Sequence, residues 1–173
     1  MIRNTHRRTL PVPASTLAPL LAGLGGSQDL LWPAGWPPLR LDGPVAVGAA
    51  GGHGPIRYRV STYEPGRRVR FTMDPACGLR GHHELVLEPR GSGCELRHEL
   101  VVRPLGSLRV LGPTLVLPLH DALIEDLLDR AERFATGGVA APARWSARVR
   151  SARWVMRRVR LGHRRRGRVP AVR

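Results

Sequence analysis

The stretch IRYRVSTYEPGRRVRFTM, residues 56–73, alternates apolar with polar side chains on both sides of the turn sequence EPGR. Proline at the second position and glycine at the third are typical of a tight β-turn. A turn there places four side chains on one face: Val60 opposite Phe71, and Tyr58 opposite Met73. Because the turn and the alternation agree on one register, the stretch predicts an antiparallel hairpin with one buried face.

Residues 79–104 predict a second hairpin, with its turn at residues 89–92. Pairing Leu87 with Cys94 points four further side chains toward the interior: His83 opposite His98, and Leu85 opposite Leu96. The same register places Glu84 opposite Arg97 on the outer face, where opposite charges across two strands are favourable. The two hairpins together predict an antiparallel sheet with one apolar face.

The segment before these hairpins begins with a predicted strand at residues 2–10, whose outer side is basic. Residues 13–26 predict a short helix that ends at two glycines. The following segment, up to residue 41, contains three prolines that a helix interior does not tolerate. We expect a second short helical turn and a loop there.

A long helix is predicted from Pro118 to residue 136, where apolar side chains recur at helical spacing before two glycines. His120 and Ile124 lie on its apolar face. Asp121 and Glu125 lie one turn apart on its charged face, which we interpret as solvent-exposed rather than as an acid/base pair. This helix is the only predicted element large enough to cover the sheet.

The predicted fold is therefore α+β: a curved antiparallel sheet of six or seven strands wrapped around a long C-terminal helix, with two short helices after the first strand. This order resembles the START-like superfamily, also called SRPBCC or polyketide cyclase/dehydrase-like, over residues 1–136. The resemblance rests on four stretches: LWPAGWPPLRLDGP (31–44), VGAAGGHGPIRYRVSTYEPGRRVRFTM (47–73), LRGHHELVLEP (79–89) and LHDALIEDLLDRAE (119–132). It carries no catalytic signature, so it implies a fold more strongly than a function.

The resemblance implies a helix-grip fold with a deep cavity between sheet and long helix that holds a small, mostly apolar molecule. A cavity for such a ligand would exceed ~300 Å³. The inward positions predict its ligand-binding residues: Tyr58, Val60, Phe71, Met73, His83, Leu85, Leu96, His98, His120 and Ile124. The family's loop at the cavity mouth corresponds to Gly51, Gly52, His53 and Gly54, which form either a gate or a plain strand connection.

Three inward histidines are the candidates for chemistry: His83, His98 and His120. One of them could act as a general acid or base, which makes a cyclase, dehydratase or hydrolase the alternative to a binding protein. They could also bind zinc or another borderline metal if all three converged on one point, or be packed side chains satisfied by hydrogen bonds. The chain holds two cysteines and no dinucleotide or Walker motif, so neither a metal nor a cofactor is predicted.

Net charge divides the chain in two. Residues 1–143 hold 16 Arg and 13 acidic residues, whereas residues 144–173 hold 12 Arg and no acid. We therefore predict a domain at residues 1–138, a linker at 139–143 and a basic tail at 144–173. The tail is either a solvated extension or attaches to an anionic membrane or nucleic acid. No transmembrane segment is predicted, and the sequence favours a cytoplasmic protein, with peripheral membrane attachment as one alternative.

Overall fold

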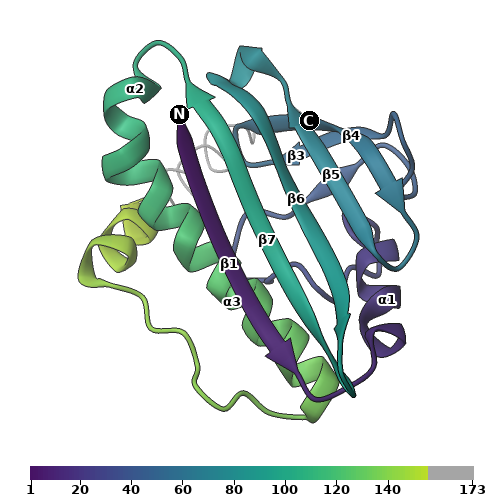
Figure 1. Ribbon diagram of the computed structural model, residues 1–173. Coiled ribbons are helices and arrows are strands. Elements are labelled where there is room, and N and C mark those ends of the chain that lie inside the picture. Colours follow the sequence, from purple (N-terminus) through teal and green to yellow (C-terminus); the bar gives the residue numbers. More distant parts are fainter. Residues whose placement is uncertain (156–173) are drawn as a thin grey trace, which may run out of the picture. The chain divides into compact units, whose positions relative to one another are not determined.

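Seven strands form one antiparallel sheet in the computed structural model, which describes residues 1–155. The strand order is β1-β7-β6-β5-β4-β3-β2, and a long helical stretch lies against one face of the sheet (Figure 1). The strands are β1 (Ile2–Leu10), β2 (Arg40–Leu41), β3 (Ala50–His53), β4 (Ile56–Glu64), β5 (Arg68–Met73), β6 (Leu79–Arg90) and β7 (Gly93–Pro104). The helical segments are α1 (Ala14–Ala22), η1 (Pro75–Cys77), α2 (Leu108–Leu111), η2 (Gly112–Val116) and α3 (Leu117–Thr136). The predicted α+β helix-grip architecture is confirmed.

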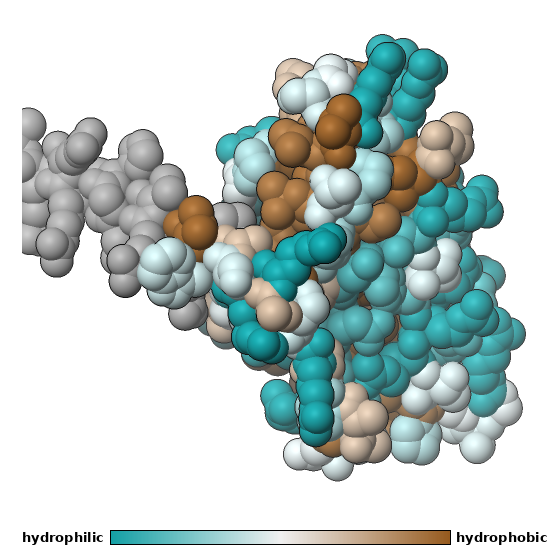
Figure 2. Space-filling model, turned by 90° about the vertical axis from the view of Figure 1, so that its left-hand side faces the viewer, coloured by the Kyte–Doolittle hydropathy of each residue, from teal (hydrophilic) through white to brown (hydrophobic). Residues whose placement is uncertain are grey.

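In the helical stretch from α2 through η2 to α3, the C-terminal part of α3 packs against the sheet. Five apolar side chains of α3 are buried: Leu123, Ile124, Leu127, Leu128 and Ala131. At the other end, Val110, Leu111 and Leu115 are exposed. Figure 2 shows the side of the molecule that is on the left in Figure 1; hydrophobic side chains gather toward its upper end, whereas hydrophilic side chains dominate below. Removal of the α3 side chains from water is therefore what fixes the helix on the sheet.

The two predicted pairs of the first hairpin are confirmed: Val60 pairs with Phe71, and Tyr58 pairs with Met73. Nearer the turn the register shifts by one residue, so Glu64 pairs with Arg68 and the loop has three residues instead of the predicted two. The register of the second hairpin is wrong by two residues, because Leu87 pairs with Leu96 and His83 pairs with Leu100. The physical reason is the turn, since Arg90 pairs with Gly93 and leaves only two residues between the strands. A shift of two keeps every side chain on its predicted face, because side chains alternate with a period of two.

The second short helix predicted after the first strand does not form, since α1 is the only helix between β1 and β2. The segment between α1 and β2 runs as turns instead. The Asp29 carboxylate accepts hydrogen bonds from the backbone N–H groups of Gly25, Leu31 and Trp32, at 2.8–3.0 Å. These N–H groups are satisfied by a side chain, and the following prolines prevent a helix from continuing.

The chain divides into two compact units, and the boundary lies between Ala143 and Arg144. The predicted linker is part of the first unit: the Ala140 N–H donates to Glu132 and the Ala143 N–H donates to Asp129, each at 2.8 Å. In the second unit residues 147–155 are helical, and the Arg153 guanidinium lies 4.2 Å from the centre of the Trp145 ring. The rest of the predicted basic tail, residues 156–173, lies outside the described residues. Within residues 1–155, no helix is both long and apolar enough to cross a membrane.

Candidate functional site: a histidine-lined cavity

A small cavity lies between the sheet and α3. Its wall combines an aromatic and histidine side with an aliphatic side: Leu24, Trp32, Leu39, His53, Tyr58, Phe71, His83, Leu85, His98, His120, Leu123, Ile124 and Leu127. Seven of the ten predicted ligand-binding residues are in this wall: Tyr58, Phe71, His83, Leu85, His98, His120 and Ile124. The sheet contributes its inward positions and the helix contributes its apolar face, as period-two and helical patterns require.

Three of the predicted ligand-binding residues, Val60, Met73 and Leu96, are buried in the core but do not line the cavity. The wall also contains five side chains that were not predicted as ligand-binding residues: Leu24, Trp32, Leu39, Leu123 and Leu127. Alternation determines which face a side chain is on, but not how high it lies along the strand. Trp32 belongs to the turn segment after α1, for which no sequence period exists.

The free space in the cavity that a water molecule can occupy is about 20 Å³. A cavity of this size holds about one water molecule. The expectation of a cavity above ~300 Å³ is therefore wrong for the described structure. The inward-facing aromatic and leucine side chains fill the space that the sheet and helix enclose, so a larger ligand could enter only if they moved.

A row of rings crosses the cavity wall. The Nδ1 atom of His53 lies 3.1 Å from the Tyr58 hydroxyl oxygen, and the Tyr58 ring meets the His83 ring edge-on at 4.9 Å. His83 Nδ1 lies 3.2 Å from His98 Nε2, a hydrogen bond between the two imidazoles. The His98 and His120 ring centres are 5.0 Å apart. The three histidines predicted to point inward are therefore neighbours along one wall of the cavity, with His98 between His83 and His120.

Three imidazole nitrogens in this row are buried and have no hydrogen-bond partner: His83 Nε2, His98 Nδ1 and His120 Nδ1. The first two belong to the hydrogen-bonded pair of His83 and His98. Their side chains are almost completely enclosed, since the residues are 8% and 2% exposed. Burial lowers the pKa of both imidazoles well below the ordinary value and lowers that of His53 to about 4. Both nitrogens therefore belong to neutral rings near pH 7, and an unsatisfied buried polar atom costs about 1–3 kcal/mol.

The glycine-rich segment is mostly a strand. Gly51, Gly52 and His53 lie in β3, which pairs with both β4 and β2, and Gly54 lies in the turn to β4. A Cβ atom on Gly51 would lie 2.0 Å from the Arg40 carbonyl oxygen, so only glycine allows β2 to approach this closely. This close pairing favours the plain strand connection, while a gating role of the segment stays a prediction.

The charged face of α3 is only partly exposed, and not fully as predicted: the Asp121 and Glu125 side chains are 41% and 38% exposed, and those of Asp129 and Glu132 are 12% exposed. It lies against β1, whose inward side chains His6 and Arg8 meet it. Arg8 donates to Asp129 at 3.0 Å, to Glu125 at 3.2 Å, and also to Glu132. His6 lies between the same helix's carboxylates, with Nδ1 2.6 Å from Glu125 and Nε2 3.3 Å from Asp121. We name this set the β1–α3 charge cluster: His6, Arg8, His120, Asp121, Glu125, Asp129 and Glu132.

The sequence contains one signal for this cluster that the interpretation missed. His6 and Arg8 occupy alternate positions of β1, and acidic residues recur every three or four positions along α3. Two such patterns predict complementary charged faces only if the strand and the helix are known to be neighbours. That neighbourhood arises because β1 pairs with β7 at the sheet edge, directly beside α3 (Figure 1).

Solved structures share this architecture at low sequence identity. CalU16 from Micromonospora echinospora matches with a TM-score of 0.55 and 16% identity, covering 88% of this chain and 82% of that one. The chain has a helix-grip fold. A norcoclaurine synthase point mutant from Thalictrum flavum, in complex with a transition-state analogue, matches this helix-grip chain with a TM-score of 0.57 and 13% identity. That match covers 79% of this chain and 94% of the synthase.

A third helix-grip structure, DR_A0006 from Deinococcus radiodurans, matches with a TM-score of 0.52 and 18% identity over 79% of this chain and 99% of that one. No protein-family model matches the sequence, and no curated protein matches it either. At these identities the likeness establishes the helix-grip fold. What the cavity does has to be argued from its own residues.

Proposed function

We propose that this helix-grip domain binds a small, mostly apolar molecule between its sheet and α3, with a polar group of that molecule on His83 and His98. The observation that carries the proposal is that each histidine of this hydrogen-bonded pair in the cavity wall has a second nitrogen that is buried and unpartnered. Buried polar atoms in proteins almost always have a partner, which is protein, ordered water or a ligand. Neutral imidazoles can donate or accept, so a hydroxyl, carbonyl or amide of the ligand fits them.

Ligand entry requires the wall to open, because about 20 Å³ admits a single water molecule. Trp32 is the large side chain of the wall that lies in neither a helix nor a strand. It contacts the His53 ring at a centre distance of 4.9 Å. We expect outward movement of Trp32 and His53 to make room for the apolar part of the ligand, while the two nitrogens hold the polar part.

A thermal-shift screen against lipids and aromatic polyketide-like compounds tests the binding proposal. Hits should raise the Tm of the wild type but not that of the double variant His83→Leu/His98→Leu. That variant removes both imidazoles of a hydrogen-bonded pair together, so it should leave the free energy of unfolding within about 1 kcal/mol of wild type or raise it. His82→Leu is the matched control, because His82 precedes His83 on β6 and faces the other side of the sheet.

Hits that bind the double variant as tightly as the wild type would show that the ligand does not use these histidines. A screen with no hit from either compound class would overturn the proposal of a mostly apolar ligand. We do not expect the double variant to be more stable than the wild type and still bind the ligand as tightly, because functional sites commonly retain unsatisfied polar groups at a cost in stability.

Catalysis is the second candidate, and the neutral state of the histidine pair favours it. A neutral imidazole with a free nitrogen can accept a proton from a bound substrate, which contributes ~10²–10⁴-fold to a rate. Each hit should therefore also be incubated with the protein and analysed by mass spectrometry for cyclised, dehydrated or hydrolysed products. Turnover that disappears in His83→Gln while binding persists would assign an enzyme; binding without turnover would assign a carrier or sensor.

We also propose that residues 144–173 attach the domain to an anionic surface, because 12 Arg without any acid lie in this segment. A chain ending at Ala143 keeps the hydrogen bonds of Ala140 and Ala143 to α3, so its Tm should equal that of the full chain. Only the full chain should bind anionic liposomes, with ~1 kcal/mol per Arg near the surface, and binding should weaken with salt. If the full chain binds oligonucleotides and not liposomes, the partner of this segment is nucleic acid. If the full chain and the chain ending at Ala143 bind liposomes and oligonucleotides equally, the proposed attachment is wrong.

A further inference from the structure

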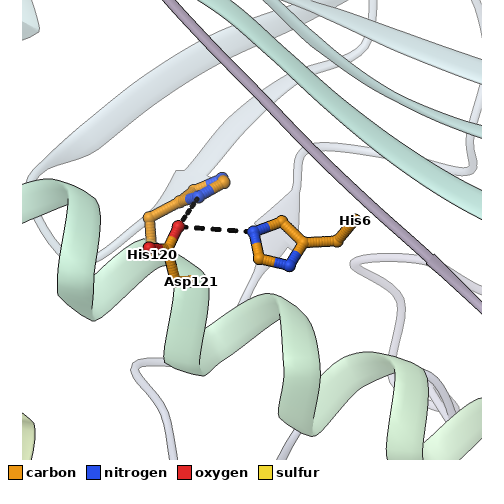
Figure 3. A group of neighbouring side chains, drawn as sticks. All are labelled: His6, His120 and Asp121. Carbon is orange, nitrogen blue, oxygen red and sulfur yellow. Dashed lines mark hydrogen bonds and ion pairs between the residues drawn. The ribbon is translucent and has the colours of Figure 1, made fainter.

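Two imidazoles and a carboxylate converge where β1 meets the start of α3. His6 comes from β1, while His120 and Asp121 are neighbours on α3, and all three side chains point toward one another (Figure 3). One ligand atom from each residue lies within 4.8 Å of the other two. His6 Nε2 is 3.3 Å and His120 Nδ1 is 3.8 Å from the same atom, Asp121 Oδ1.

We propose that His6, His120 and Asp121 form a binding site for a divalent transition-metal ion, zinc foremost. Ligand atoms about 2.1 Å from a tetrahedral ion lie about 3.4 Å from one another, and the distances of His6 Nε2 and His120 Nδ1 from Asp121 Oδ1, 3.3 and 3.8 Å, are close to that value. Imidazole and carboxylate together suit zinc and the neighbouring transition metals rather than magnesium or calcium, which take oxygen ligands. This proposal does not rest on ligand binding in the cavity.

The hydrogen bonds around the set favour a cation over a simple ion pair. A doubly protonated His6 would satisfy Asp121 on one side and Glu125 on the other, at 3.3 and 2.6 Å. That arrangement leaves His120 Nδ1 buried without a hydrogen bond, because 3.8 Å to Asp121 is too long for one. A metal ion between the three residues gives a partner to both imidazole nitrogens and to the carboxylate at once.

Glu125 occupies the position that an orienting carboxylate has around metal-bound histidines. It lies against His6 Nδ1, which directs the His6 Nε2 lone pair toward Asp121 and His120. Arg8 holds the other Glu125 oxygen at 3.2 Å. Glu125 is therefore a positioning residue, and its removal should weaken metal binding without changing the number of ions bound.

The position of the site gives an ion both access and a possible role. The Asp121 side chain is 41% exposed, so an ion can enter from solvent. His120 also lines the cavity, so the site adjoins the histidine row. Three protein ligands leave at least one coordination position for water or for an oxygen or nitrogen atom of a small molecule.

Isothermal titration of the chelator-treated full chain with Zn²⁺ tests the site, with Co²⁺ absorption as the spectroscopic readout. We expect one ion per chain, a dissociation constant below about 10 µM and no competition from Mg²⁺. Asp121→Asn and His6→Gln should each weaken Zn²⁺ binding at least ~100-fold, and Glu125→Gln should weaken it ~10–100-fold while one ion still binds. His82→Gln, on the outer face of β6, is the control and should bind as the wild type does.

Circular dichroism of each variant separates loss of a ligand from loss of the fold. If Asp121→Asn does not fold, Glu125→Gln and the Co²⁺ spectrum of the wild type still test the proposed metal site. Co²⁺ bound by nitrogen and oxygen ligands of the protein has an absorption spectrum that differs from that of Co²⁺ in water. Absence of binding up to roughly 1 mM Zn²⁺ would overturn the proposal. Binding that Asp121→Asn and His6→Gln leave unchanged would overturn it as well, because the ion would then be held at a different place on the chain.

Discussion

Replacing Arg8 with Met should lower the free energy of unfolding by about 3–5 kcal/mol, because it leaves three carboxylates of α3 without their common cation. Arg8 is 19% exposed, and its partners Asp129 and Glu132 are 12% exposed. The third partner, Glu125, is more exposed and contributes less, since solvent screens it. Met retains the apolar stem of the side chain, so the loss reports the charge and its hydrogen bonds.

Arg7→Met is the matched control. Arg7 is the neighbouring residue of β1 and faces the exposed side, so its replacement should change the free energy of unfolding by less than about 0.5 kcal/mol. Urea denaturation of the three proteins at pH 7 measures the difference. Equal stability of wild type and Arg8→Met would mean that the β1–α3 charge cluster does not hold the strand and helix together.

Acidification below pH 6.5 should destabilise the protein by up to about 1.4 kcal/mol per pH unit for each buried neutral histidine, and burial lowers the pKa of four of them: His53, His83, His98 and His120. Burial, with His120 and Arg57 adding to it, lowers the pKa of His53 to about 4. Burial also lowers the pKa of His83 well below its ordinary value. The unfolded chain takes up protons below pH ~6.5 that the folded chain does not, so stability is fully present above that pH and is lost as the pH falls.

Urea denaturation at pH 7.5, 6.5 and 5.5 tests the histidine contribution. His83→Leu should reduce the slope of stability against pH by about a quarter, because it removes one of four buried neutral histidines, whereas His82→Leu should leave the slope unchanged. A slope that His83→Leu does not alter would mean that His83 becomes protonated in the folded protein. Carboxylates affect stability at lower pH than the histidines do. Burial alone would raise the pKa of Glu84, but hydrogen bonds from Arg70 and Arg68 lower it. The stability that ionised Glu84 contributes is therefore lost only as the pH falls below the ordinary pKa of a glutamate.

The sequence by itself determined which side chains face the interior of the sheet. Alternation has a period of two, so the inward direction of His83 and His98 survived even though their hairpin pairs two residues away from the predicted register. In the first hairpin the apolar pattern predicted the inward pairs Val60–Phe71 and Tyr58–Met73, but not the register shift between Val60 and Thr62 or the three-residue loop at residues 65–67. In the second hairpin, the turn residues are compatible with two registers that differ by two residues and keep the same side chains on each face. Only the complete pairing of β6 with β7 determines which of the two forms.

Only the tertiary structure decided what lies against the charged face of α3. Asp121 and Glu125 have the spacing of a solvent-exposed helix face, and a sequence period cannot report the neighbour that covers it. The strand that covers them, β1, is more than a hundred residues away in the chain and reaches α3 by pairing with β7 at the sheet edge. The same limit applies to the cavity, whose volume depends on how large side chains interlock between sheet and helix. Periodicity assigns a side chain to a face, whereas long-range pairing and packing decide which groups meet there.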